Sequence, residues 1–278
     1  MKDLIQFLRR NTLAMVGAGI LGALLLAVLV GPLLVQSPTA IDMGAKLLPP
    51  GPGHWLGTDS FGRDMLSRLV HGGRYTLAIG ILVVGIAFVI GVFFGVIAGF
   101  TGGWLDTVIM RIVDAMLSFP ALVLAIALAA AFGPSLENAM LAVAITMAPQ
   151  FARVARSQAL AVSSRLYVDA AHALGLPQRR ILLRYVLVNA IGPLLVQASL
   201  NVGSAILQTA SLGFLGLGAQ PPLPEWGADV SANLAFARSS PWTALGPGFA
   251  ILLAVLSFNL IGDALADWFN PRRRSQIA

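Results

Sequence analysis

The 278-residue sequence has no cysteine and very few charged residues. Without cysteine, the chain can form neither disulfides nor thiolate metal sites. Only 11% of its residues are charged and 57% are hydrophobic, whereas a soluble globular domain carries about 25% charged residues. Water is therefore not the main solvent of this chain, and its 18 basic residues must be interpreted by their position along the sequence.

Motifs for nucleotide hydrolysis and for hydrolytic catalysis are also missing. A P-loop requires Gly-x4-Gly-Lys-Ser/Thr, but neither of the two lysines, Lys2 and Lys46, follows a glycine. The sequence contains no His-Glu-x-x-His and no Gly-x-Ser-x-Gly motif. Its three histidines, His54, His71 and His172, are scattered over predicted loops, which favours surface or capping roles over a metal site. We therefore expect no enzymatic activity and no metal site in this chain.

Long runs with little or no charge dominate the rest of the sequence. A bilayer core about 30 Å thick needs roughly 20 apolar helical residues to cross it. The six candidate runs are 13–35, 75–100, 115–136, the segment between Glu137 and Arg153, 185–224 and 239–262. Buried core helices of a large soluble protein are the alternative, but six such runs in one small chain argue against it. The sequence predicts an all-α integral membrane protein with six transmembrane helices.

The distribution of Lys and Arg predicts the orientation of these spans. With six spans, 13 of the 18 basic residues fall on the side that holds both termini, and five fall on the other side. Both termini are therefore expected in the cytoplasm. The first run is too long for a cleaved signal and no clear small-x-small site follows it, so we expect a retained anchor.

The first external loop contains apolar residues at helical spacing. In "GTDSFGRDMLSRL", Phe61, Met65 and Leu69 follow one another at intervals of four residues. This pattern predicts an amphipathic helix that lies on the outer membrane surface or caps a pore mouth.

A polar stretch, "YVDAAHALGLPQRRIL", lies between two hydrophobic runs on the predicted cytoplasmic side. A short helix is expected over 163–174, with Ser163 or Ser164 as its N-cap. Gly175 suits the left-handed position that ends a helix, and Pro177 suits the first turn of a second helix. The predicted unit is a helix, a tight turn and a helix. It is either an interfacial loop among anionic headgroups or a rigid protrusion that a cytoplasmic partner grips.

A stripe of neutral polar residues runs along the fifth hydrophobic run. Its members are Gln197, Asn201, Ser204, Gln208 and Ser211. At 100° per residue they fall within about 80° of one helix face. Such groups are unfavourable in lipid, so the stripe is expected to face inward. It serves either interhelical hydrogen bonding or a translocation pathway with several weak contacts.

At the polar stretch, the sequence resembles the permease subunits of ATP-binding-cassette importers, which carry a cytoplasmic Glu-Ala-Ala-x3-Gly loop. Asp169, Ala170, Ala171 and Gly175 occupy the matching positions, with Asp in place of Glu. A wider similarity to the dipeptide/oligopeptide/nickel group covers nearly the whole chain. It is carried by "HWLGTDSFGRDMLSRL", "GGWLDTVIMRIVDAMLSFPALVLAIAL", "SLGFLGLGAQPPLPEWG" and "SFNLIGDALADWFNPR".

The resemblance implies a type I importer permease fold with cytoplasmic coupling helices, in the bacterial inner membrane. It also implies a related second permease, two cytoplasmic ATPase subunits that bind ATP and magnesium, and an external solute-binding protein. No cofactor in this chain and no nucleic-acid partner are expected. Coupling to the ATPase is assigned to the four motif residues together with Arg179 and Arg180. Members of the group often have Ser or Asp where Leu176 and Pro177 stand, and an acid where Thr209 stands, so any role of that acid cannot be transferred.

On this basis we expect three segments: an N-terminal anchor with the external loop (1–72), a permease domain (73–267) and a basic cytoplasmic tail (268–278). The expected function is to form half of a translocation pathway for di- and oligopeptides. A nickel or metal–chelator importer is the alternative within the group. An autonomous channel or ion-coupled carrier is the alternative outside it, and copurification with an ATPase distinguishes the two classes.

Overall fold

The computed structural model describes residues 11–269, and over this range it contains helices and connecting segments but no strand. The predicted all-α fold is confirmed. The α-helices are α2 (Thr12–Val30), α3 (Met65–Thr101), α4 (Gly103–Leu117), α5 (Ala121–Phe132), α6 (Leu136–Ser163), α7 (Leu166–Ala173), α8 (Gln178–Ile181), α9 (Leu187–Phe214), α10 (Trp226–Asn233) and α11 (Trp242–Phe269). Shorter elements are the 3-10 turns Gly31–Leu33, Met43–Ala45 and Leu234–Phe236 and the π-helical turn Leu182–Val186.

Several of these helices are long and apolar enough to cross a membrane. Within residues 11–269 there are four such segments: Thr12–Leu33, Met65–Thr101, Gln178–Phe214 and Trp242–Trp268. The bent pair α4 and α5 gives up to five. The count of six spans therefore stays a prediction. So do the cytoplasmic termini, because the terminal basic residues at 2, 9, 10 and 272–274 lie outside the described residues.

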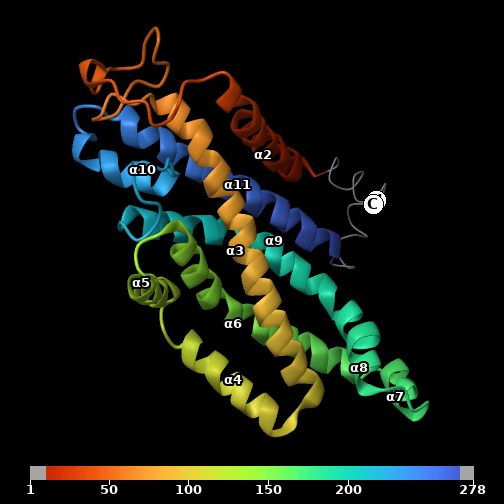
Figure 1. Ribbon diagram of the computed structural model, residues 1–278. Helices are drawn as coiled ribbons and strands as arrows, with labels where there is room; N and C mark the ends of the chain where they lie inside the picture. The colour runs from red at the N-terminus through yellow and green to blue at the C-terminus, as the bar shows by residue number, and fades with distance from the viewer. Residues whose placement is uncertain (1–10, 270–278) are drawn as a thin grey trace.

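Helix α6, which contains the predicted fourth span, packs closely against α3. Gly91, Gly95 and Gly99 lie on the face of α3 that meets α6. A Cβ atom at these glycines would lie 2.4, 2.2 and 2.6 Å from the backbone carbonyl oxygens of Ala148, Ala152 and Arg156. Only glycine permits so close an approach of two backbones. The two helices therefore form a tightly joined pair in the half of the molecule that carries α4, α7 and α8 (Figure 1).

The predicted span over 115–136 is interrupted in the structure. Helix α4 ends at Leu117, α5 begins at Ala121, and the two helices are bent by 94° at this break. Pro120 explains the break, because proline has no backbone N–H to donate and disfavours helical geometry at the residue before it. Apolar composition alone does not reveal such an interruption.

The predicted amphipathic helix in the first external loop is also wrong. Residues 57–63 form a non-helical loop with a turn at 60–61, and α3 begins only at Met65 with Asp64 as its N-cap. The Asp59 carboxylate accepts bonds from the backbone N–H groups of Phe61 and Arg63, at 2.8 and 2.9 Å. Such local bonding by aspartate competes with the helix. Met65 is consequently buried in the core, whereas Phe61 is half exposed.

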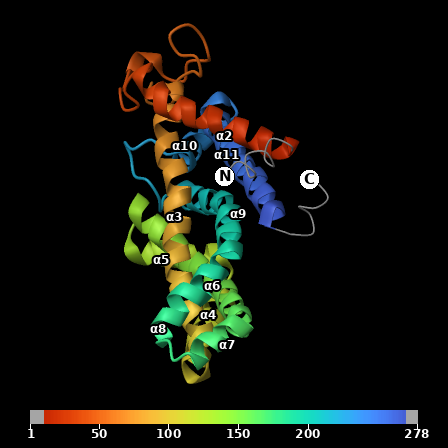
Figure 2. The same ribbon diagram turned by 90° about the vertical axis from the view of Figure 1, so that its right-hand side faces the viewer.

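The folded loop and the helix–turn–helix lie at opposite ends of the molecule. Figures 1 and 2 both show residues 36–64 at one end of α3 and α7 with α8 at the other. This separation agrees with the expectation that the two segments face opposite sides of a membrane.

Candidate functional site

The polar turn predicted to couple to a partner lies between α7 and α8. The predicted N-caps are wrong: α6 continues to Ser163, and α7 begins after Arg165, which makes no side-chain capping bond. The Ser164 hydroxyl donates back to the carbonyl oxygen of Ala161 at 3.1 Å. Ser164 thus ends α6 instead of starting α7, a common role of serine near helix ends.

Gly175 ends α7 in the predicted left-handed conformation, with φ of +72°. Its N–H donates to the His172 carbonyl at 2.9 Å, and the N–H of Leu176 donates to the Ala171 carbonyl at 3.2 Å. This pair of bonds defines the Schellman motif, which satisfies carbonyl groups at the end of a helix. The local geometry predicted for Gly175 is confirmed.

Pro177 comes directly before α8 as its N-cap residue. Its carbonyl accepts bonds from the N–H groups of Arg180 and Ile181, at 2.8 and 3.2 Å. Helix α8 continues through the π-helical turn into α9, so the second arm of the turn is the base of a long helix. The turn and α9 are therefore joined without an intervening loop.

A small core holds the turn in place. Val168 and Ala171 of α7 and Ile181 of α8 are buried in one cluster with residues of α3, α6 and α9. The His172 ring stacks on Phe100 of α3, with ring centroids 6.4 Å apart. Its Nδ1 lies 3.0 Å from the Val168 carbonyl and its Nε2 lies 3.3 Å from Gln178 on the other arm. These contacts fix both arms against the end of α3–α6.

The outer surface of the turn is exposed and carries the other predicted coupling residues. Asp169, Ala170, Gly175, Arg179 and Arg180 are all exposed, whereas Ala171 belongs to the core. Two leucines flank them with large exposed side chains: Leu166 is 85% exposed and Leu174 is 80% exposed. An exposed apolar surface on a rigid protrusion is typical of an interaction site.

The five stripe residues all lie on α9. Gln197, Asn201, Gln208 and Ser211 are partly buried, and Ser204 is exposed. The Asn201 amide and the Ser211 hydroxyl each donate to the carbonyl oxygen four residues before, at 2.8 Å. The Oε1 atom of Gln208 is buried and has no hydrogen-bond partner in the part of the chain that the structure describes. Gln208 thus keeps an acceptor that no group within residues 11–269 uses.

A hollow of about 460 Å³ adjoins one end of the stripe. It lies between α5, α9, α10 and α11, and its lining includes Leu122, Ser211, Gly227 and Ile251. Ser211 brings the stripe into this mainly apolar space. The arrangement allows weak contacts to a solute but offers no charged group to fix one.

Charged residues of α4 pair with α6. Asp114 accepts a bond from Arg153 at 2.6 Å, although Arg111 lies three residues before Asp114 on the same helix. Asp106 accepts two bonds from Arg156, at 2.5 and 2.6 Å.

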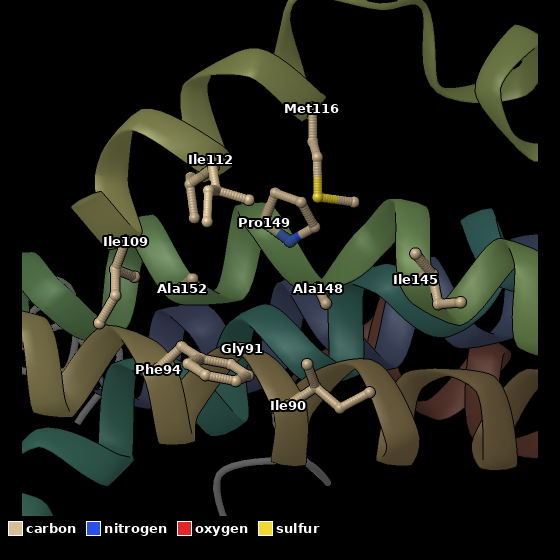
Figure 3. Close-up of a pocket in the computed structure, with 11 residues that line it drawn as sticks. Ile90, Gly91, Phe94, Ile109, Ile112, Met116, Ile145, Ala148, Pro149 and Ala152 are labelled. Atoms are coloured by element: carbon tan, nitrogen blue, oxygen red, sulfur yellow. The ribbon is translucent and has the colours of Figure 1, made fainter.

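The helices α3, α4 and α6 also enclose an apolar cavity of about 240 Å³ (Figure 3). Its lining presents no polar surface, so it suits neither a metal nor a polar ligand.

A buried polar network at the other end of α3 escaped the sequence analysis. Arg68 forms an ion pair with Asp229 of α10 and also donates to the carbonyl of Pro38 at 3.1 Å. Glu225 accepts a bond from the Thr76 hydroxyl at 3.1 Å, and burial raises the pKa of the Glu225 carboxyl above its ordinary value. Because Arg68 and Asp229 are 161 residues apart, no local sequence signal predicts their contact.

The described residues provide surfaces for binding. Within residues 11–269, no group of three or more His, Cys, Asp or Glu side chains has a geometry that would hold a metal ion. The turn offers an exposed contact surface, and the stripe offers neutral hydrogen-bonding groups.

Comparison with known proteins places these features in a context. Residues 91–275 match the family described as "binding-protein-dependent transport system inner membrane component", and residues 1–50 match the "N-terminal TM domain of oligopeptide transport permease C". The chain is 44% identical over 275 residues to the dipeptide transport system permease protein DppC of Alkalihalophilus pseudofirmus, which covers 99% of this chain and 90% of that protein.

Two further relatives are similar over most of their length. The probable D,D-dipeptide transport system permease protein DdpC of Escherichia coli is 46% identical over 270 residues, 97% of this chain and 91% of that protein. The di/tripeptide transport system permease protein DppC of Pseudomonas aeruginosa is 43% identical over 220 residues, 79% of this chain and 73% of that protein.

Proposed function

Because the chain belongs to the family of inner membrane components of binding-protein-dependent transport systems, we propose that it forms half of the translocation pathway of a peptide importer. In this proposal it is the permease subunit of an ATP-binding-cassette system for di- and oligopeptides. The family match, together with the rigid protruding turn between α7 and α8, supports this function most strongly. The resemblance seen in the sequence thus agrees with the family.

The partners follow from what the chain itself does not supply. ATP and magnesium bind to two cytoplasmic ATPase subunits, which dock on the turn around Asp169 and Gly175. The exposed Leu166 and Leu174 become covered in that contact, and Arg179 and Arg180 add charge at its edge. A related second permease completes the pathway, and an external solute-binding protein delivers the cargo. This chain carries no cofactor of its own.

The chain is a multi-pass protein of the inner membrane. For its orientation we propose that both termini and the turn face the cytoplasm, while residues 36–64 face outward. The distribution of basic residues supports this orientation. Five arginines lie in α6, in α8 or in the segment between them: Arg153, Arg156, Arg165, Arg179 and Arg180.

The names of the relatives favour peptides as cargo over nickel complexes. The relatives named above are transport proteins for dipeptides, D,D-dipeptides and di- or tripeptides. The neutral stripe on α9 suits such cargo, because amides can exchange hydrogen bonds with Gln208 and Asn201 without a charge that would hold the peptide in place. We therefore propose that the stripe lines the pathway.

Affinity purification of the tagged chain from native membranes tests the proposed class. We expect an ATPase subunit and a second permease of the same family to copurify with the wild-type chain. The double variant Leu166→Ser, Leu174→Ser is expected to lose the ATPase while it retains the second permease. Purification of the wild-type chain alone, with solute transport intact, would instead identify an autonomous carrier.

A further inference from the structure

The helix that joins the coupling turn to the stripe contains one irregular turn. Residues Gln178–Phe214 form a single helical segment, but Leu182–Val186 within it adopts π-helical geometry. The N–H of Leu187 donates to the carbonyl of Leu182, five residues before it instead of four. A π-helical turn of this kind accommodates one extra residue and is frequent at functional sites.

The buried face of this helix shows what the extra residue does. Ile181, Val186, Ala190 and Leu194 are each 0% exposed and belong to the core under the turn. The first interval is five residues and the next two are four. In a regular α-helix, the residues on the same face as Ile181 would be those at positions 185 and 189. Asn189, however, is exposed. The π-helical turn keeps α8 and α9 in one core despite the extra residue.

Side chains around the π-helical turn fit this geometry. Leu183 and Arg184 are exposed, so the additional residue adds bulk to the surface and not to the core. The Asn189 side-chain amide donates to the Tyr185 carbonyl at 2.6 Å, which gives a carbonyl of the irregular turn a side-chain partner. Four residues further on, Pro193 has no N–H with which to continue the regular ladder.

We propose that the π-helical turn is a positioning element that sets the rotational register between the coupling turn and the polar stripe. One residue corresponds to about 100° of rotation about a helix axis. Without the extra residue, the stripe from Gln197 to Ser211 and the turn at Gly175 would be rotated by that angle relative to each other. The register, rather than any single side chain, lets movement of the turn reach the stripe. This inference rests on the proposed function, because it takes the turn as the ATPase contact.

Three variants separate the effect of the rotational register between turn and stripe from the effect of the Leu183 side chain. Deletion of Leu183 removes one residue and converts the π-helical turn into regular α-helix. Deletion of Leu183 combined with insertion of an alanine between Val188 and Asn189 restores the number of residues between turn and stripe. Leu183→Ala keeps the length and removes only the exposed side chain.

The measurement is ATP hydrolysis by the complete reconstituted complex, with and without dipeptide-loaded binding protein, alongside recovery of the ATPase subunit. Leu183→Ala should keep stimulation within twofold of wild type, and the deletion should reduce the rate to the unstimulated level. The deletion with insertion should recover at least half of the stimulation. A deletion variant with wild-type stimulation, or an insertion that restores nothing, overturns the proposal. If the wild-type complex itself shows no stimulation and recovers no ATPase, the proposed function fails and the inference fails with it.

Discussion

The substitution Gly175→Val probes the coupling turn by changing its backbone preference without creating a clash. Gly175 has φ of +72°, and no atom lies within 4 Å of the position that a Cβ would take. The cost therefore comes from the left-handed conformation itself, about 1–2 kcal/mol for a residue with a Cβ. A change of this size lowers the population of a conformation by a factor of about 5–30. The turn should lose its Schellman geometry while the core around Val168 and Ile181 remains.

The expected result is a strong loss of peptide uptake and of cargo-stimulated ATP hydrolysis, at normal levels of membrane-inserted protein. Gly175→Asn serves as the matched control at the same position, because asparagine tolerates the left-handed region, and it should retain most of the coupling. Gly216→Val is the control for position, since Gly216 has φ of +79°, an equally open environment and lies at the other end of α9. Gly216→Val should leave the amount of ATPase subunit that copurifies with the chain unchanged. A well-expressed Gly175→Val complex with wild-type coupling would refute the reasoning.

Three further predictions concern other parts of the molecule. Arg68→Ala leaves the buried Asp229 without its partner and should lower the free energy of unfolding by about 3–5 kcal/mol, whereas Arg153→Ala, in an ion pair that is 57% exposed, should cost less than about 1 kcal/mol. Thermal unfolding in detergent compares the two, and equal losses would contradict the assignment. Because the native chain has no cysteine, the single cysteine of Gln208→Cys should react with a small hydrophilic thiol reagent, at a rate that changes when ATP is trapped on the partners. If this cysteine stays unreactive in every state of a working transporter, the stripe serves only helix packing. Trp55→Cys and Leu174→Cys, at side chains that are 77% and 80% exposed, should be labelled from opposite sides of the membrane, and labelling from one side would disprove the topology.

Features that depend on composition or on neighbouring residues were predictable from the sequence. Charge-free runs identified the long apolar helices, because the bilayer imposes the same requirement on every residue of a span. Gly175 was predictable because a left-handed position at the end of a helix favours glycine regardless of the tertiary structure. The spacing of the stripe on α9 followed from helical periodicity alone.

Two kinds of feature were not predictable: those in which side-chain bonding to the backbone competes with a helix, and those that depend on contacts between residues far apart in the sequence. The apolar spacing of Phe61 and Met65 suggested a helix, but the Asp59 carboxylate bonds locally to the backbone and forms turns instead. Asp114 had Arg111 at helical spacing, yet tertiary packing brings Arg153 closer. The π-helical turn has no local sequence signature, since it depends on how the buried face of α8 and α9 packs against a core formed by three other helices.

ATP-dependent uptake of a labelled dipeptide into proteoliposomes tests the central proposal most directly. The chain is reconstituted with its second permease and ATPase subunits, and the dipeptide is offered on the external binding protein. We predict uptake that requires ATP, magnesium and every partner, and that Gly175→Val abolishes while Gly175→Asn retains it. Uptake by this chain alone, or uptake that persists without ATP, would contradict the account.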